Sequence, residues 1–372
     1  MQKLRSSASY LKDLKPYDPK YLPARIYLNA NESPYGLPEA VLDSLLESVS
    51  EQMLHRYPDP LAMDLRSTLA KINKVSTSNV LLGNGGDELI FDIMLAYGGT
   101  GRKLLIAPPS FSSYELDAKL TDTTLVEIPR VRRRMYDERA SVETIVFGVD
   151  EDAVLKRVSQ GDIDVVMLAS PNNPSGDVLR KDFVVALLNA SDALILIDQA
   201  YVEFADPQFD MRPYLAKHKN LAILRTFSKA FALAGIRLGY LLADDELVSE
   251  LCKVRQPYSV DVFSALAGNT VLSHPEVFSG RIVESIDERK RITQELSGLP
   301  GVVVHASEAN FILIQVEHAN RIWQRLYDEN GILLRDFSSA PYLTDCLRVS
   351  VGTPNENDEF LKSFTAILGE VS

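Results

Sequence analysis

The sequence predicts an α/β protein with a mostly parallel sheet covered by helices, followed by a smaller α+β unit. Two observations predict this. Between residues 80 and 244, short apolar runs alternate with segments of helical periodicity, a pattern typical of a parallel sheet with helices on both faces. Beyond about Ser259, long helical segments precede a few strand-like runs. We therefore expect an N-terminal arm over residues 1–38, a large domain over 39–258 and a small C-terminal domain over 259–372.

The elements follow in order along the chain. The first 30 residues are rich in Lys, Pro and Tyr without clear periodicity, so we expect an arm that lies over another surface. Residues 37–53 and 60–72 carry apolar residues at spacings of three and four, and each predicts an amphipathic helix. In the sheet region, the runs expected to be strands are "VLLG", "KLLIA", "TTLVEI", "DVVMLAS", "ALILID", "LAILRT" and "YLLAD".

Composition and charge narrow the class of protein. The chain has 372 residues, enough for two domains, and its 46% hydrophobic and 24% charged content is typical of globular proteins. Its 39 Lys and Arg against 51 Asp and Glu give a net charge of −12, which disfavours nucleic acid and anionic membranes as partners. The N-terminal residues lack an apolar signal core, and no apolar run approaches the ~18 residues that span a bilayer. We expect a cytoplasmic protein.

Two cysteines and a cluster of arginines need separate interpretation. Cys252 and Cys346 have neither CxxC spacing nor a nearby His, which favours two inert core thiols in a reducing compartment over a zinc site. No metal site is expected. Arginine is concentrated in "PRVRRRMYDERASVET", and we interpret this segment, residues 130–144, as a solvated surface loop, because runs of charge usually lie on the surface.

Polar groups follow several of the expected strands, at the edge where α/β sheets bind ligands. "VLLGNGGDE" ends a strand in glycines and opens a helix whose free N–H groups suit a phosphate, although a plain strand-to-helix turn explains it as well. "SPNNPSG" is a rigid turn that fixes its asparagines, and turn-making alone is an equal explanation.

A buried carboxylate and a buried lysine are the more informative pair. Asp198 ends the apolar run "ALILID", where a carboxylate is costly unless it meets a cation or a donor. Lys229 in "RTFSKAF" is either an ion-pair partner for Asp198 or a nucleophile that forms an imine. Together with the asparagines, hydroxyls and glycines on the same edge, these groups are the ones that hold a phosphorylated pyridine aldehyde.

With these motifs in place, the chain resembles the fold-type I pyridoxal-phosphate aminotransferases, and within them it is similar to histidinol-phosphate aminotransferases. The resemblance implies a seven-stranded sheet, the cofactor pyridoxal 5'-phosphate and a homodimer with shared active sites. It covers nearly the whole chain and rests on "LNANESP", "HRYPDP", "GNGGDE", "PPSFSSY", "SPNNPSG", "IDQAYVEF", "RTFSKAFALAGIRLGY", "NFILI", "ILLRD" and "CLRVSVG".

By position, the resemblance assigns the catalytic residues and the cofactor ring contacts. Lys229 forms the Schiff base with the cofactor and later shuttles the substrate's proton. Asp198 keeps the ring nitrogen protonated, while Asn173 and Tyr201 donate to the ring's phenolic oxygen. Phe111 stacks on the ring; the family usually has tyrosine there, so the hydroxyl is missing in this chain. The family's Asp-Glu-Ala-Tyr is here Asp-Gln-Ala-Tyr, which keeps the aspartate and the tyrosine.

The same carry-over assigns the phosphate and substrate contacts. The cofactor phosphate is expected to bind Thr226, Ser228, Arg237, the backbone N–H groups of Gly86 and Asp87, and Tyr57 of the opposite subunit. The substrate is expected to bind Arg348, Arg335, Tyr17 and Asn31.

The expected reaction is a ping-pong transamination. Glutamate donates its amino group, and imidazole-acetol phosphate receives it, which gives 2-oxoglutarate and histidinol phosphate in histidine biosynthesis. Three alternatives remain: an aminotransferase for aromatic amino acids, a decarboxylase of a phosphorylated amino acid, and a catalytically silent module used in regulation. The intact set of Lys229, Asp198 and Tyr201 argues against the last of these.

Overall fold

Leucine-, isoleucine- and valine-rich runs build a central seven-stranded sheet in the computed structural model, which describes residues 11, 14, 22–138 and 140–371. Each of its inner strands is buried on both faces, as parallel strands between helices require. Strand β10 runs antiparallel to both its neighbours, and the other pairs are parallel. The strand order is β2 (Val80–Asn84), β10 (Leu238–Ala243), β9 (Leu221–Thr226), β8 (Leu194–Asp198), β7 (Val165–Ala169), β3 (Lys103–Ile106) and β4 (Thr124–Glu127).

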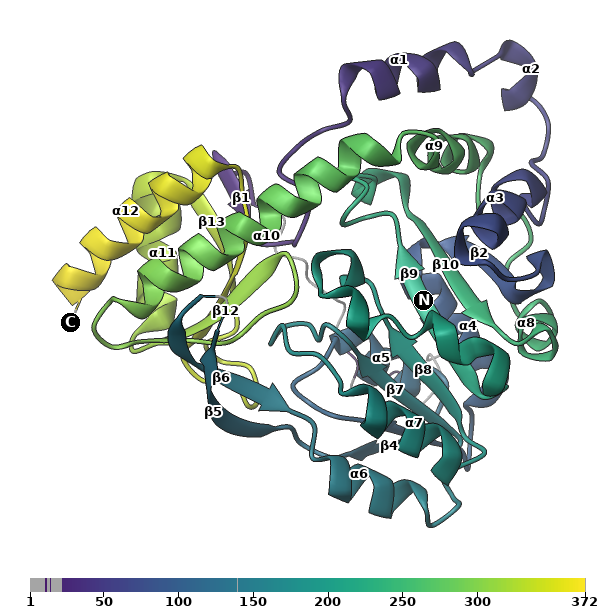
Figure 1. Ribbon diagram of the computed structural model, residues 1–372, viewed down its shortest axis with the longest axis horizontal. Coiled ribbons are helices and arrows are strands. Elements are labelled where there is room, and N and C mark those ends of the chain that lie inside the picture. Colours follow the sequence, from purple (N-terminus) through teal and green to yellow (C-terminus); the bar gives the residue numbers. More distant parts are fainter. Residues whose placement is uncertain (1–10, 12–13, 15–21, 139, 372) are drawn as a thin grey trace, which may run out of the picture.

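Helices cover both faces of this sheet (Figure 1). One face packs against α4 (Gly85–Tyr97), α5 (Ser112–Leu120) and α8 (Asp245–Leu251). The other face packs against α3 (Met63–Asn73), α6 (Glu151–Val158), α7 (Lys181–Ala190) and α9 (Val262–Leu272). Short 3-10 turns lie at Thr77–Asn79, Val202–Phe204, Pro207–Phe209, Arg212–Lys217 and Ala234–Ile236. The expected mostly parallel, seven-stranded α/β architecture is confirmed.

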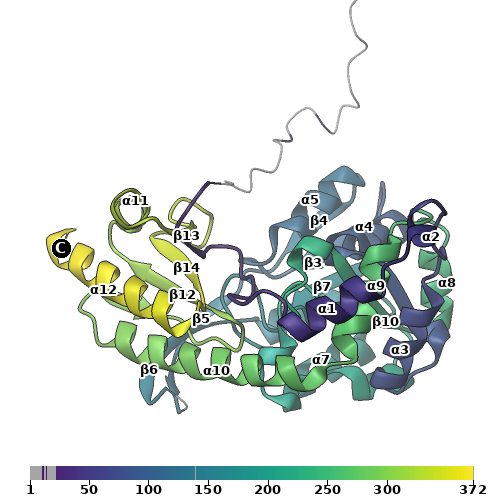
Figure 2. The same ribbon diagram turned by 90° about the horizontal axis from the view of Figure 1, so that it is seen from above.

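A second sheet of five strands forms the smaller unit, with its own hydrophobic core. Its order is β1 (Ile26–Leu28), β13 (Ile332–Asp336), β14 (Cys346–Ser350), β12 (Phe311–Val316) and β11 (Val302–Val304). Helices α10 (Pro275–Ser297), α11 (Ala319–Asn330) and α12 (Pro354–Val371) accompany it. Figure 2 shows α10 running from the large unit to the small one.

The domain limits stay a prediction, and two features bear on them. Strand β1 lies within the expected arm and pairs in parallel with β13 of the small sheet. Helix α9 lies beyond residue 258, yet Ala267 and Val271 belong to the core of the large sheet. The passage from one unit to the other therefore runs along α10.

One expected helix is divided. The pattern of residues 37–53 predicts a single helix, whereas the chain forms α1 (Glu39–Glu47) and α2 (Glu51–Leu54). Ser50 lies between them in an extended conformation, and Ser48 Oγ donates to the carbonyl of Ser44. Serine hydroxyls compete with helical hydrogen bonds in this way, so an apolar pattern that continues across them does not keep the helix intact.

The arginine-rich segment is not a surface loop. It forms a hairpin of β5 (Val131–Asp137) and β6 (Val142–Gly148), which joins the small unit through a bridge between Ile145 and His305. Most of β5 is exposed, as the charges predict, but Arg130 just before it is buried. The interpretation as a solvated loop is therefore wrong: residues 131–137 pair with residues 142–148 as strands, and Arg130 has a buried partner.

Membrane-spanning helices and clusters of metal ligands are both absent from the described part of the chain. No helix there is both long and apolar enough to cross a bilayer. Among the same residues, no three His, Cys, Asp or Glu side chains gather in a group that could hold a metal ion. Cys346 is buried, Cys252 is partly exposed, and both are free thiols.

Candidate active site

The carboxyl ends of the central strands bring the expected catalytic residues to one edge of the large sheet. Asp198 is the last residue of β8, and Thr226 is the last residue of β9. Asn173 lies in the turn after β7, and Lys229 follows β9 by three residues. Parallel strands end at the same edge, so this placement follows from the topology.

Asp198 is a buried carboxylate with two hydrogen-bond donors. Its Oδ2 accepts from the hydroxyl of Tyr114 at 2.7 Å, and its Oδ1 accepts from the backbone N–H of Ala200 at 3.0 Å. Burial nevertheless raises the pKa of Asp198 to about 6, because desolvation disfavours the charged form more than the two donors favour it. A cationic group placed against this carboxylate would offset that cost.

Lys229 is a partly buried amine at the same edge. Its Nζ donates to the carbonyl of Ala30 at 2.9 Å and lies 5.8 Å from the centre of the Tyr201 ring. Burial, together with the nearby guanidinium of Arg348, lowers the pKa of Lys229 to about 8. A lysine with this pKa holds a substantial neutral fraction near pH 8, and the neutral amine is the nucleophilic form.

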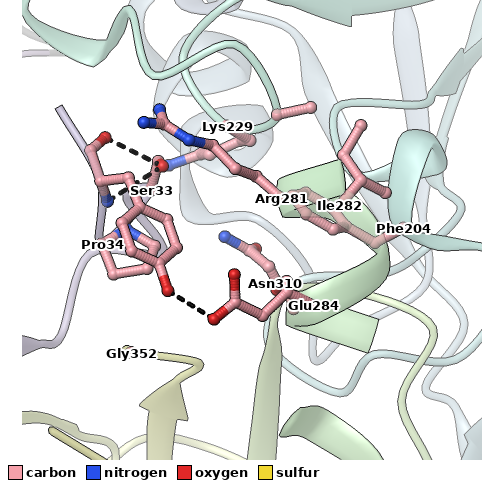
Figure 3. A pocket seen from close by; sticks show the side chains of 12 residues that line it. Ser33, Pro34, Phe204, Lys229, Arg281, Ile282, Glu284, Asn310 and Gly352 are labelled. Carbon is pink, nitrogen blue, oxygen red and sulfur yellow. Dashed lines mark hydrogen bonds between the residues drawn. The ribbon is translucent and has the colours of Figure 1, made fainter. Parts of the chain in front are cut away.

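A small pocket borders Lys229 on the side of the N-terminal segment. Figure 3 shows Ser33 and Pro34 on one side, Arg281 and Glu284 of α10 on another, and Lys229 above Asn310. The N-terminal segment that contains Ser33, Pro34 and Tyr35 is held against α10 by a hydrogen bond of 2.7 Å, which the hydroxyl of Tyr35 donates to Glu284. These contacts hold the chain that carries Ala30 and Asn31 close to the lysine.

Asn31 connects this segment to both sheets. Its Nδ2 donates to the hydroxyl of Tyr201 at 3.0 Å, and its Oδ1 accepts from the hydroxyl of Ser350 on β14 at 3.1 Å. The residue is buried and has a φ of 54°, a left-handed conformation that asparagine tolerates better than most residues. Asn31 therefore fixes the hydroxyl of Tyr201 beside Lys229.

A compact cradle lies where β2 passes into α4. Arg237 Nη2 donates to Asp87 in the first turn of α4 at 2.8 Å. Gly85 has a φ of 77°, and a Cβ on it would stand 2.5 Å from Arg237 Nη2, so glycine is required there. A Cβ on Gly239 would stand 2.7 Å from the backbone carbon of Gly85.

Hydroxyl groups complete the cradle from the end of β9. Thr226 Oγ1 lies 3.0 Å from Ser228 Oγ and accepts from the backbone N–H of Ser228 at 3.1 Å. The N-terminus of a thirteen-residue helix, whose second residue is Gly86, adds unpaired N–H groups and a positive dipole end. Hydroxyls, a guanidinium and a helix N-terminus together suit a phosphate group.

Two arginines face each other across strands of the small sheet. Arg335 on β13 and Arg348 on β14 are direct partners in the antiparallel register, so their side chains leave the same face. Both guanidiniums lie over the ring of Phe337, at 5.8 Å and 5.6 Å from its centre. Arg348 also donates to Oδ1 of Asn173, which joins the small sheet to the large one at the site.

Phe111 lies at the start of α5 and makes an edge contact with Tyr114, with ring centres 5.7 Å apart. Tyr57 is placed differently from the other expected residues. Its side chain is 83% exposed and stacks on Tyr258 at 4.8 Å. Tyr17 lies outside the described residues.

Sequence reasoning missed Tyr114 as the partner of Asp198. A signal was present, because Tyr114 follows Phe111 by three residues on one helix, and that spacing places both side chains on the same side. It also missed Phe337, whose ring lies under both arginines. The contact of Phe337 with both arginines depends on the pairing of β13 with β14, which the local sequence does not predict.

Comparison with known proteins agrees with this geometry. The family model for aminotransferase class I and II matches residues 24–364. Histidinol-phosphate aminotransferase 1 of Carboxydothermus hydrogenoformans is 41% identical over 370 residues, 99% of this chain and 100% of that protein. The histidinol-phosphate aminotransferase of Chlorobium phaeobacteroides is 35% identical over 361 residues, which are 97% of this chain and 96% of that protein.

A solved structure shows the same fold. The histidinol-phosphate aminotransferase of Sinorhizobium meliloti, in complex with pyridoxal-5'-phosphate, superposes with a TM-score of 0.87 at 23% identity. The match covers 100% of this chain and 99% of that one. This chain therefore belongs to the class I and II aminotransferase family, and it is similar over its whole length to histidinol-phosphate aminotransferases.

Proposed function

We propose that this protein is a pyridoxal-phosphate-dependent transaminase that moves an amino group from glutamate to imidazole-acetol phosphate. The products are 2-oxoglutarate and histidinol phosphate, a step in histidine biosynthesis. The names of the full-length relatives support this substrate. Within the site, the facing arginines Arg335 and Arg348 are the observation that carries the proposal.

Like charges directly opposite each other in an antiparallel pair repel, so two arginines at one register position form a favourable place for an anion. Histidinol phosphate presents a phosphate, and glutamate presents a carboxylate. Guanidinium groups bind both with paired hydrogen bonds. Arg335 and Arg348, the arginine clamp, would therefore bind the phosphate of histidinol phosphate in one half-reaction and the carboxylate of glutamate in the other, as a ping-pong enzyme requires.

The residues of the large sheet fit the cofactor. Thr226, Ser228 and Arg237 suit its phosphate, together with the N–H groups of Gly86 and Asp87 at the start of α4. Asp198 is a buried carboxylate whose cost falls if it faces a protonated ring nitrogen. When bound, pyridoxal phosphate supplies the electron-withdrawing ring that stabilises negative charge on the substrate's α-carbon.

Each side chain then has a defined task. Lys229 Nζ would hold the cofactor and would carry a proton to or from the substrate's α-carbon, for which a pKa near the working pH is favourable. Asp198 would keep the ring nitrogen protonated. Asn173 and Tyr201 would donate to the ring's phenolic oxygen, and Phe111 would stack on the ring. Arg335, Arg348 and Asn31 bind the substrate, with Tyr17 as a further contact.

The test adds histidinol phosphate to the purified yellow holoenzyme without any keto acid. The expected result is loss of the cofactor's yellow absorbance within one turnover, and its return when 2-oxoglutarate is added. If histidinol phosphate leaves the spectrum unchanged while glutamate alters it, the protein is a transaminase with another substrate.

Two alternatives are decided in the same assay. An aromatic aminotransferase would respond to phenylalanine better than to histidinol phosphate. A decarboxylase would release carbon dioxide from phosphothreonine and would need no keto acid. In the aromatic aminotransferase, Arg348 would bind a carboxylate in both half-reactions.

We also propose that the enzyme is a cytoplasmic homodimer with shared sites. Tyr57 is highly exposed in a single chain, and exposed apolar side chains accompany it along α1, α2 and the segment after them: Leu42, Leu46, Leu54, Leu61 and Met63. Patches of this kind mark interfaces. A negative net charge gives no reason to expect nucleic acid or membrane as a partner. Light scattering that gives the mass of one chain would contradict the dimer.

A further inference from the structure

A fully buried ion pair lies beneath the turn that carries Asn173. Arg130 donates through Nη1 to Oδ2 of Asp177, and their side chains are 0% and 3% exposed. The mechanism proposed above uses neither residue. Arg130 also belongs to the arginine-rich segment, residues 130–144, to which the proposed function assigns no role.

Arg130 joins three parts of the large unit. Its Nε donates to the carbonyl of Ala107 at 3.0 Å, in the segment that leads from β3 to Phe111. Its Nη1 donates to the carbonyl of Phe147 in the hairpin at 3.1 Å. The third contact is Asp177, at the end of the Asn173 turn. The fork of one guanidinium therefore sets the spacing between the segment that leads to Phe111 and the turn that carries Asn173, the two residues proposed to contact the cofactor ring.

Asp177 transmits this position into the turn. Its Oδ1 accepts from the hydroxyl of Ser175, and Ser175 Oγ accepts from Nδ2 of Asn172 at 2.6 Å. The backbone N–H of Asn172 donates to the carbonyl of Asp177 at 2.8 Å, which closes the turn on itself. Asn172 Nδ2 also donates to the carbonyl of Pro109 at 3.0 Å. Asn173 is thus enclosed between tethered neighbours.

The amide oxygen of Asn173 is already engaged in a hydrogen bond within the protein. This oxygen, Oδ1, accepts from Arg348, so the donors that Asn173 can offer to a ligand are on Nδ2. A rotation of the turn would move the amide and the arginine together. We propose that Arg130, acting through Asp177, is a positioning residue that aims the Asn173 amide at the cofactor's ring oxygen.

Stability alone is a weak reason for this pair. Removing two charges from water costs about as much as their attraction returns, and apolar replacements are often neutral. Nearby arginines such as Arg133 remain exposed in the hairpin. A buried pair linked to an active-site turn by a chain of hydrogen bonds is better explained by the geometry that it maintains.

The test uses the holoenzyme without substrate and follows the pH midpoint of its cofactor absorbance. The inference rests on the proposed cofactor contact of Asn173. A donor to the ring oxygen withdraws electron density from the cofactor's bond to Lys229, so loss of that donor makes the nitrogen more basic. Asn173→Ala should raise the midpoint by about one to two pH units, the strength of a hydrogen bond to a charged group.

The charge-pair variant Arg130→Met/Asp177→Leu should raise the midpoint by a similar amount while its melting temperature stays close to that of the parent. In an Asn173→Ala background, the same two substitutions should add no further shift, because their effect passes through Asn173. Arg133→Met is the matched control and should leave the midpoint unchanged.

An unchanged midpoint in the charge-pair variant overturns the inference, and so does an equal additional shift in the Asn173→Ala background. If the charge-pair variant does not fold, Ser175→Ala breaks the same chain and keeps the ion pair; it must then raise the midpoint. The readout needs no substrate. If the protein fails to turn over histidinol phosphate, the pH midpoints still test the role of Arg130; if the midpoints contradict that role, the substrate proposal is unaffected.

Discussion

Aspartates at the two ends of the seven-stranded sheet lie in opposite environments. Asp162, near the amino end of β7, is exposed and pairs with Arg157 and Lys103, whose hydrogen bonds hold its pKa well below the usual range. Asp198, at the carboxyl end of β8, is buried, and its pKa is raised to about 6. One end carries charges that local partners and water satisfy, and the other carries charges that have been desolvated.

This difference separates function from ordinary surface chemistry. Exposed ion pairs such as Arg102 with Asp164 at the amino end contribute little, because water screens them. Desolvated groups such as Asp198 and Lys229 cost free energy in the protein alone, and a bound ligand of complementary charge would offset that cost. The following substitutions compare the two ends directly.

The largest effect is expected for Lys229→Ala. Loss of the covalent and proton-transfer group should lower kcat by on the order of 10⁴-fold or more, and the yellow absorbance should disappear. Lys103→Ala is the matched control at the other end, and it should keep full activity. Steady-state kinetics and the absorbance spectrum check both. Persistence of the yellow linkage in Lys229→Ala would disprove the role of this lysine.

The next effect is expected for Asp198→Asn, which keeps the shape and removes the charge. The ring nitrogen would lose its counterion, and kcat should fall by roughly 10²- to 10³-fold, as when one preorganised electrostatic contact is removed. Asp162→Asn should leave kcat unchanged. The measurement is a single-turnover rate with glutamate, and equal losses in the two variants would mean that the ends do not differ in function.

The fold could be predicted from sequence where apolar periodicity decides it. The strand at 194–198 and the helix over 63–73 follow from runs that admit one interpretation. The break between α1 and α2 could not be predicted, because the apolar pattern continues across Ser48 and Ser50. The hairpin at 131–148 was missed because its first strand is almost wholly exposed and rich in arginine, so no alternation of apolar and polar residues marks it.

The sequence suggests which residues form the candidate site, but it does not predict the contacts between them. Lys229 and Asp198 stand out locally, as charges after buried strands. Tyr114 as the partner of Asp198, and the register of Arg335 against Arg348, depend on contacts between segments far apart in the chain. No local pattern encodes such contacts, because packing of the whole fold decides them.

A smaller effect is expected for the arginine clamp. Arg348→Met should raise the KM for histidinol phosphate about 10- to 100-fold, the range for one charge-assisted contact, with a lesser effect on kcat. Arg335→Met should act in the same direction. Arg102→Met at the amino end is the control and should leave KM unchanged. A fall in kcat at constant KM would place Arg348 outside the substrate site.

The smallest effect concerns pH. Because burial and Arg348 lower the pKa of Lys229 to about 8, the amine is protonated below that pH and neutral above it. Only the neutral amine attacks an aldehyde, so binding of pyridoxal phosphate to the apoprotein should accelerate with a midpoint near pH 8, rising roughly tenfold from pH 7 to above the midpoint. Arg348→Met removes a cation beside the lysine and should move the midpoint upward. Lys103→Ala should not move it. Stopped-flow absorbance at a series of pH values gives these midpoints, and a midpoint near the ordinary lysine value would mean that Lys229 is not desolvated at this end of the sheet.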